Sequence, residues 1–506
     1  MKMLSPTRIG QKINHLLEAK AGNLRKNYFV FHVNPAVEIS LMAVLLTCFL
    51  LLNLTTASIF PSAWQDEVMF VDPAVNLYLG KGFTSSAWPT ISRNELWAGY
   101  PPLYPFLLSL WMRFFGFSLA AVRSLNYILI TGAAAVLWIA VIRLGLVTSA
   151  RGRFVLITLL LSGYGISFCY RSARPDCLAI FLITIAIFSY SIQVSYIRRI
   201  CLTCLSILLL LTGLYLVIYV LVAGCLGIIY LKKSFFKEFL CLVIGLFIGA
   251  VILYSFYSFH DSWTSFITSV DYEKSNLEQS LFKNKVPYDP SLIAAISLII
   301  GAFVYYLRKK GPCSNSKISF GVVASIFIPG LFYALGKFPT YYGWMLYLPL
   351  IICLSSVLLD GKKIGLRSLF TLVFVCLVGL PLFLTASSLS MNGKNYEAME
   401  LLAERTVKSE DWAYCNFGSY FVVKKRADEV FLPSHLPALS DSDRDRISVL
   451  FIQPDGLKKA KAALGGQWYD SGEGMKPRRN AALNFGPLAL DEYNLRVFRR
   501  TQKASL

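Results

Sequence analysis

The sequence predicts a polytopic α-helical membrane protein with about eleven transmembrane helices and a small C-terminal α/β domain. Two observations predict this class. Of the 506 residues, 56% are hydrophobic and only 15% are charged, whereas a soluble domain has about 25% charged residues. The charged residues gather in short clusters between long apolar runs, which is typical of a chain that crosses a bilayer repeatedly.

The formal net charge of +20 does not indicate a nucleic-acid-binding protein. Most of the excess lies between apolar runs, where Lys and Arg act as orientation signals and contact anionic lipid head groups. We therefore expect membrane lipids as partners and no nucleic acid. Residues 1–36 are basic and show no cleavable signal peptide, so they predict a cytoplasmic N-terminal segment. The eleven cysteines lie mostly inside apolar runs and indicate no disulfide framework.

The first apolar run, 37–58, is long enough to cross a bilayer as a helix. Basic clusters occur in every second connection between the later apolar runs. All of these clusters lie on the cytoplasmic side only if residues 103–117 do not cross the membrane and lie instead along the external face. Pro101-Pro102 and Pro105 also argue against an ordinary span at that place. The other predicted spans are 120–142, 154–170, 176–194, 200–213, 215–231, 236–258, 291–307, 318–336, 341–358 and 366–388.

Residues 37–389 therefore form the predicted transmembrane domain, and from about residue 390 the composition turns polar. The tail predicts a strand over Ile447 to Ile452, a helix over Leu457 to Leu464 and a final strand over Tyr493 to Phe498. Residues 390–506 thus predict an α/β domain, which eleven spans place outside the cytoplasm.

Acidic residues mark the predicted external face. Asp66 and Glu67 follow the first span, in the first external loop, 59–119, which we expect to include juxtamembrane helices. A carboxylate at a membrane face keeps access to water while it touches a low-dielectric surface, which raises its pKa and suits it to accept a proton. A capping or solvated acid pair is an equally weighted alternative.

Basic residues accompany the acids at two predicted external turns. Arg171 and Arg174 come just before Asp176, and Lys337 comes just before Pro339. Arg and Lys bind phosphate groups, and a nearby carboxylate can deprotonate an acceptor hydroxyl or amine. A lipid phosphate would bring its phosphate to this depth. Interfacial snorkelling is the alternative for these basic residues; we weight it most for Arg171 and favour Arg174 and Lys337 as phosphate ligands.

Other kinds of site have little support in the sequence. There is no P-loop, no dinucleotide-binding glycine pattern after a strand and no arguable Ser-His-Asp set. A metal site that uses Glu95 or Asp176 stays open, although the one histidine near the external face, His260, has no histidine partner.

The order of the motifs resembles a known family. The motifs are Asp66-Glu67, then Glu95 with Ala98-Gly99-Tyr100-Pro101-Pro102-Leu103-Tyr104-Pro105, then Arg174-Pro175-Asp176, then Lys337-x-Pro339-Thr340-Tyr341. This order resembles the membrane glycosyltransferases of the GT-C fold, above all the bacterial aminoarabinose transferase of lipid A and the protein O-mannosyltransferases. The resemblance covers about residues 37–358 and, more loosely, the tail. It implies an integral protein of the bacterial inner (plasma) membrane.

The resemblance implies that a sugar moves from a polyprenyl-phosphate carrier to a lipid, glycan or protein acceptor, with inversion at the anomeric carbon. It implies that Asp66 is the catalytic base, that Asp176 is a second acid, that Glu95 lies near a bound divalent metal and that Lys337 lies near the carrier phosphate. We count Glu67 with the catalytic candidates. The substrate-binding candidates are Glu95, Tyr100, Arg171, Arg174, Lys337 and Tyr341.

This chain departs from the aminoarabinose branch at three positions. Met69 and Leu96 stand where that branch has Arg and Lys, and Tyr272 aligns roughly with its loop histidine near the metal. Aminoarabinose specificity and a metal therefore stay open. A transporter or flippase of a lipid-linked sugar is the alternative from another class, but the ionisable residues lie at one face and no paired halves are visible. A glycan ligase or polymerase is a further alternative.

The basic clusters predict the topology of the chain. A reporter that is active only outside the cytoplasm should be active after Leu506 and silent after Lys310. Reporter fusions in whole cells check this expectation. The reverse signals would contradict the map of eleven spans.

Overall fold

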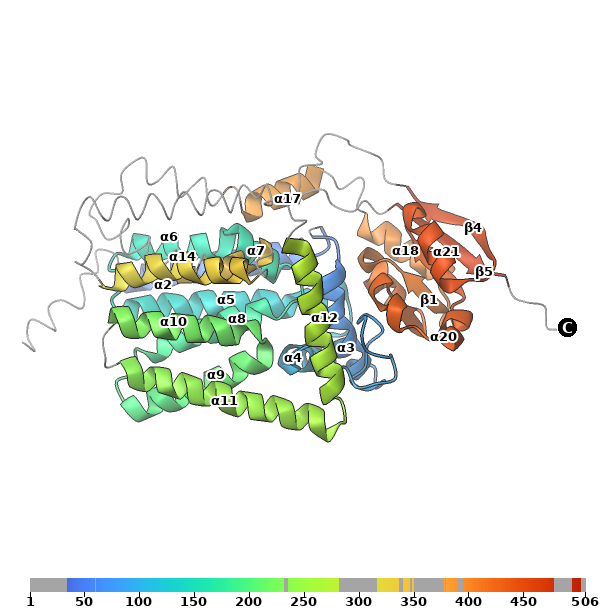
Figure 1. The fold of residues 1–506 in the computed structure, drawn as a ribbon. Coiled ribbons are helices and arrows are strands. Elements are labelled where there is room, and N and C mark those ends of the chain that lie inside the picture. Colours follow the sequence, from blue (N-terminus) through green and yellow to red (C-terminus); the bar gives the residue numbers. More distant parts are fainter. Residues whose placement is uncertain are drawn as a thin grey trace, which may run out of the picture.

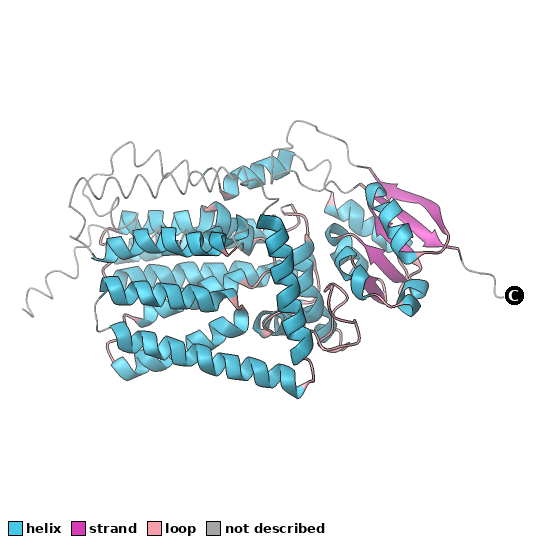
Figure 2. Cartoon of the chain, viewed as in Figure 1, coloured by secondary structure: helices cyan, strands magenta, loops and turns pink. Residues whose placement is uncertain are grey.

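A computed structural model gives the fold of the chain. The described part has a body of helices, followed along the chain by a small unit that combines helices with a sheet (Figures 1 and 2). The predicted span 291–307 lies outside the described residues, as do most of the spans 341–358 and 366–388, so the number of eleven spans stays a prediction. The structure describes residues 34–59, 61–231, 235–281, 316–335, 340–345, 348–349, 377, 379–389, 395–476 and 494–501.

Several helices of the body suit a membrane. Helix α11 leaves Ile244, Phe247 and Val251 exposed on its surface, and a contiguous exposed apolar face is typical of contact with lipid. These helices make the chain an integral membrane protein. Within the described residues, four helices are long and apolar enough to cross a bilayer: α2 (Pro35–Thr55), α5 (Leu119–Arg143), α9 (Ser195–Thr212) and α11 (Phe236–Phe259). Shorter apolar helical stretches are Leu103–Phe115 (α4), Asp176–Ser189 (α8), Tyr215–Tyr230 within α10 (Tyr215–Leu231) and Phe320–Phe332 within α14 (Ser316–Ala334).

The apolar helices pack side by side with helices that are not their immediate neighbours in the sequence. α5 packs along α8 and α2, α9 packs along α11, and α10 packs along α14. Ser118 begins α5, because its side chain accepts a hydrogen bond from the Ala121 amide. A further helix, α12 (Trp263–Leu281), runs across the direction of the others (Figure 1).

The predicted span 154–170 is wrong as a single helix. It forms α6 (Ala150–Ser162) and α7 (Tyr164–Tyr170), which are separated at Gly163, where the backbone is extended (φ −58°, ψ 142°). On α7, a Cβ added to Gly165 would lie 2.8 Å from the backbone of Gly343, so the short helix carries a close crossing of two backbones. The partner segment is the 3₁₀ turn η2 (Thr340–Gly343).

The region predicted as the first external loop contains helix as well as loop. Asp66 and Glu67 do not lie in a loop but in the first turn of α3 (Gln65–Tyr78), where the positive end of the helix dipole favours acidic side chains. The segment predicted to lie along the external face forms α4, which packs against α3. Gly116 ends α4 with a φ of 75°, a conformation that favours glycine.

The C-terminal unit is built on a five-stranded sheet of order β2-β1-β3-β5-β4. The first three strands in this order are parallel, and β5 is antiparallel to both of its neighbours. Every residue of β1 and β3 is buried, as is typical of parallel strands that are covered on both faces. The strands are β1 (Trp412–Cys415), β2 (Glu429–Phe431), β3 (Val449–Ile452), β4 (Trp468–Met475) and β5 (Leu495–Arg500). The helices are α18 (Tyr396–Thr406), α19 (Tyr420–Lys424), α20 (Asp441–Arg446) and α21 (Leu457–Leu464).

The sequence predicts three of these elements. The predicted helix over Leu457 to Leu464 has the bounds of α21, and the predicted strand over Ile447 to Ile452 begins two residues early relative to β3. The predicted final strand, Tyr493 to Phe498, corresponds to β5. The strands β1, β2 and β4 are not predicted by the sequence patterns.

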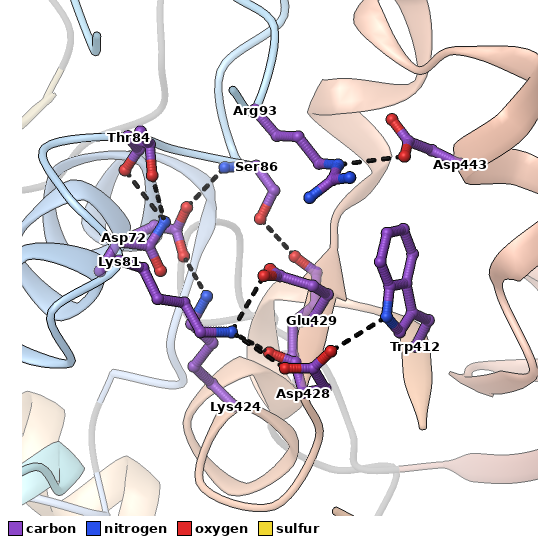
Figure 3. A network of polar contacts seen from close by, with 12 residues as sticks. Asp72, Lys81, Thr84, Ser86, Arg93, Trp412, Lys424, Asp428, Glu429 and Asp443 are labelled. Carbon is purple, nitrogen blue, oxygen red and sulfur yellow. Dashed lines mark hydrogen bonds and ion pairs between the residues drawn. The ribbon is translucent and has the colours of Figure 1, made fainter. Parts of the chain in front are cut away.

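The C-terminal unit binds the segment that follows Asp66 through a buried carboxylate on α3 (Figure 3). Asp72 is fully buried, and its Oδ1 accepts a hydrogen bond from the Tyr420 hydroxyl at 2.6 Å. Its Oδ2 accepts hydrogen bonds from the Ser85 hydroxyl and the Ser86 amide, both at 2.8 Å. The Lys424 ammonium lies 3.2 Å from Oδ1, at ion-pair distance but off the direction of a good hydrogen bond.

Further contacts surround this carboxylate. Lys81 pairs with Glu429 at 2.9 Å, and Arg93 pairs with Asp443 at 3.0 Å (Figure 3). Burial by itself would raise the pKa of Asp72, but the Lys424 charge and the hydrogen bonds outweigh burial and hold that pKa below its usual range. The carboxylate is therefore ionised and compensated where the two parts of the chain meet.

The buried pair predicts a large effect of Lys424→Met. The variant leaves the Asp72 charge without its cation, and the free energy of unfolding should fall by about 3–5 kcal/mol. Lys425→Met is the matched control, because the neighbouring Lys425 makes only an exposed pair with Glu400, and its loss should cost less than about 1 kcal/mol. Denaturant unfolding of the purified chain measures both values. Equal stability of the two variants would contradict a stabilising role for the buried pair.

Candidate active site

One arginine joins two carboxylates that come from different helices. Arg174 lies in the turn between α7 and α8; its Nη1 donates to Asp66 Oδ2 at 2.6 Å and its Nε donates to Asp176 Oδ2 at 3.0 Å. Asp66 keeps 29% of its side chain exposed, whereas Asp176 is fully buried and Arg174 is 4% exposed. Asp66 is therefore the acid of this cluster that an incoming molecule can reach.

Asp176 is fixed at both of its carboxylate oxygens. Its Oδ1 accepts a hydrogen bond from the Tyr215 hydroxyl at 3.2 Å and another from Trp344 Nε1 at 3.1 Å. Tyr215 begins α10, and Trp344 directly follows η2. The close packing of η2 on Gly165 is what brings Trp344 to this place. Asp176 thus anchors Arg174 rather than facing an open space.

Aromatic rings hold the Arg174 guanidinium from outside the ion pairs. The guanidinium carbon lies 5.2 Å from the centre of the Trp64 ring and 5.6 Å from that of Phe70, at distances where a ring face attracts a cation. The backbone of the turn is also bound, because Asn126 Nδ2 on α5 donates to the carbonyls of Ser172 and Arg174 at 2.6 and 3.0 Å. The turn is therefore fixed through both its backbone and its side chain.

Glu67, the neighbour of Asp66, makes a buried bidentate ion pair. Arg123 on α5 donates from Nε to Oε1 at 2.7 Å and from Nη2 to Oε2 at 2.6 Å, and neither side chain is exposed. Glu67 Oε1 also accepts a hydrogen bond from the Ala173 amide at 3.0 Å. Arg123 Nη1 reaches the carbonyls of Ala57 and Pro61. Glu67 therefore links α5 to the turn that carries Arg174.

Arg123 is not among the site residues that the sequence predicts. The signal that could have found it is its position as a charged residue inside the predicted span 120–142, because ionisable groups within apolar segments usually have a specific partner.

Of the remaining predicted basic and aromatic residues, two are buried and the side chains of the other two are not described. Arg171 is fully buried, and its Nη1 donates to Asn53 on α2 at 2.7 Å, so the alternative of a snorkelling residue is wrong. Tyr100 is buried, with its ring edge-on to Phe70 at 5.1 Å. Lys337 lies outside the described residues, and Tyr341 belongs to η2, where only its backbone is described.

Glu95 belongs to no group of three possible metal ligands among the described residues. It is exposed in a bend between α3 and α4. Within the described part of the chain, no three His, Cys, Asp or Glu side chains are grouped so that they could hold a metal ion.

The site can take a proton at one defined position. Among the described residues, Arg174 is the one hydrogen-bond partner recorded for the Asp66 side chain, through Oδ2, which leaves Oδ1 for a substrate hydroxyl or amine. The three charges of the cluster sum to one negative charge. The cluster is therefore suited to a general base held in position and poorly suited to binding an anion.

Comparisons with known proteins give structural matches of low sequence identity. No family model matches the chain, and no curated protein matches it. The crystal structure of ArnT from Cupriavidus metallidurans bound to undecaprenyl phosphate is 12% identical, with a TM-score of 0.42 over 93% of this chain and 99% of that one. The Archaeoglobus fulgidus oligosaccharyltransferase in complex with Zn and sulfate is 10% identical, with a TM-score of 0.46 over 82% of this chain and 69% of that one.

A third match is AglB from Archaeoglobus fulgidus in complex with an inhibitory peptide and a dolichol-phosphate. It is 10% identical, with a TM-score of 0.45 over 84% of this chain and 70% of that one. These matches all have TM-scores below 0.5. At these values they assign no residue role, substrate or acceptor to this chain.

Proposed function

We propose that the chain is a membrane glycosyltransferase that moves a sugar from a polyprenyl-phosphate carrier to a lipid, glycan or protein acceptor. The observation that carries this proposal is the cluster of Asp66, Arg174 and Asp176, in which one partly exposed carboxylate is held by an arginine whose other partner is buried. The cluster belongs to a chain whose apolar helices can cross a membrane, where a lipid-linked donor resides. The order of the sequence motifs supports the same reaction class.

In this proposal Asp66 is the general base. The acceptor hydroxyl or amine gives its proton to Asp66 Oδ1 while its oxygen or nitrogen forms a bond to the anomeric carbon of the sugar. The bond between that carbon and the phosphate oxygen breaks, and the phosphate keeps the electron pair. Attack from the face opposite the phosphate inverts the anomeric centre.

Arg174 serves in this proposal as a positioning residue for Asp66. Two carboxylates already neutralise its charge, so it is less suited to the departing phosphate than the sequence alone suggests. A phosphate that gains negative charge in a partly dry site needs a cation placed in advance. Lys337 is the residue that we keep for this role, on the basis of its motif alone, since it lies outside the described residues.

The base assignment predicts the effect of Asp66→Asn. The variant keeps the size of the side chain but cannot accept the proton, so the turnover number should fall by roughly 10²–10⁴-fold. Conversion of polyprenyl-phosphate sugar to polyprenyl phosphate by the purified chain in nanodiscs, followed by mass spectrometry, measures this. Asp441→Asn is the control, because Asp441 is 96% exposed and should keep parental activity. Near-parental turnover of Asp66→Asn would remove Asp66 from the role.

Loss of the Glu67–Arg123 ion pair should affect both stability and transfer, and a similar ion pair elsewhere in the chain serves as the control. Glu38 and Arg153 form a buried bidentate pair with the same two distances, 2.7 and 2.6 Å, between α2 and α6. Glu67→Gln and Glu38→Gln each leave a buried arginine without its anion, so both should lower the free energy of unfolding by about 3–5 kcal/mol.

Only Glu67→Gln should also slow transfer by the folded protein, because only Glu67 binds the turn that carries Arg174. Turnover per folded molecule, measured at a temperature where both variants remain folded, separates the two effects. Equal turnover of the two variants would limit Glu67 to a stabilising role.

A further inference from the structure

The sheet of the C-terminal unit has a point where its connections diverge. The neighbouring strands β1 and β3 are parallel, so their carboxyl ends lie at the same edge. The chain leaves β1 toward β2, on one side, and leaves β3 toward β4, which lies beyond β5 on the other side. In open α/β sheets, ligands bind in the crevice outside the carboxyl ends of strands at such a switch point.

A cavity of about 220 Å³ lies at this switch point. Its walls come from the segments that follow the three parallel strands and from the start of β5. They are residues 416–419 after β1, Pro433 after β2, Gln453 after β3, and Leu495 on β5. The cavity is smaller than the ~300–1,000 Å³ typical of drug-sized ligands, and it suits a single small ring.

Among the described residues that line the cavity, polar and apolar side chains are equally represented and none is charged. Asn416 and Gln453 contribute amides, which can both donate and accept hydrogen bonds, whereas the Ser419 hydroxyl already donates to the Asn416 carbonyl at 3.0 Å. Phe417 adds a half-buried aromatic ring. Neutral amides next to an aromatic ring match a neutral molecule that has several hydroxyls and an apolar face, which describes a pyranose sugar.

The Asn416 amide is half-buried and lines the cavity. Asn416 occupies the position before the 3₁₀ turn η4 (Phe417–Ser419), where an Asn side chain usually caps the helix, but its side chain makes no capping hydrogen bond. Within the described part of the chain, no hydrogen bond is recorded for this amide. A half-buried amide at the mouth of a crevice is thus available for an external partner.

We propose that this crevice binds a neutral carbohydrate, one pyranose ring at a time, at a site separate from the Asp66 cluster. The proposal does not require Asp66 to be catalytic. The crevice adjoins the contacts that the C-terminal unit makes with the segment after α3, because Ser434, next to Pro433, donates to the carbonyl of Ala87 at 2.6 Å. A sugar-bearing molecule that binds in this crevice is therefore held on the C-terminal unit, which is itself bound to α3.

Saturation-transfer NMR on the full chain tests the proposal. The probes are the methyl glycosides of glucose, galactose, mannose and N-acetylglucosamine. The chain is held in phosphatidylcholine nanodiscs, because detergents with sugar head groups would compete. At least one glycoside should receive saturation from the protein. Asn416→Ala and Gln453→Ala should each weaken its binding roughly three- to tenfold, the loss of one hydrogen bond.

Two controls make the result decisive. Gln467→Ala removes an exposed amide elsewhere in the same unit and should leave binding unchanged, as should Asp66→Asn. Phe417→Leu, with its unfolding temperature measured, separates loss of the ring from loss of the fold. Absence of saturation transfer from all four glycosides would overturn the proposal, and so would binding that survives Asn416→Ala and Gln453→Ala together. Neither result bears on the role of Asp66.

Discussion

The structure depends on charge compensation along one helix. An unpaired charge in an apolar interior costs several kcal/mol, so each buried acid fixes the position of whichever cation it meets. Helix α3 carries three paired acids, of which Glu67 and Asp72 are buried and Asp66 is partly exposed, and it meets cations from three distant parts of the chain. The pairs are Asp66 with Arg174, Glu67 with Arg123, and Asp72 with Lys424. Together they tie α3 to the turn before α8, to α5 and to the C-terminal unit.

The pairs on α3 differ in exposure, and this difference divides their roles. Glu67 and Asp72 are fully buried and bound at both oxygens, so they hold structure in place. Asp66 is partly open to its surroundings while its arginine is buried. Proton transfer needs a carboxylate that the substrate can reach and that is already held in position. The buried arginine holds Asp66 in this way, so the site reorganises little before the reaction. The proposed chemistry thus rests on rigid neighbours that take no part in it.

The sequence predicts the elements that depend on local pattern and misses those that depend on distant partners. The apolar run 236–258 corresponds to α11, Phe236–Phe259, within one residue, because length and apolarity alone define such a helix. Asp66, Arg174 and Asp176 are predicted to share a face, and the structure brings them into contact. The sequence does not predict the break at Gly163. The break precedes the place where Gly165 packs against Gly343 of η2, which lies 178 residues later in the chain. No periodicity in one segment records that contact.

The contact between Asp72 and the C-terminal unit also sets an order of events during biosynthesis. Asp72 leaves the ribosome 348 residues before Tyr420, which donates a hydrogen bond to it. During that interval the carboxylate has no partner from the C-terminal unit. The final packing of α3 therefore waits for nearly the whole chain to be made. A prematurely terminated chain therefore leaves Asp72, Lys81 and Arg93 without the charged partners that the C-terminal unit supplies.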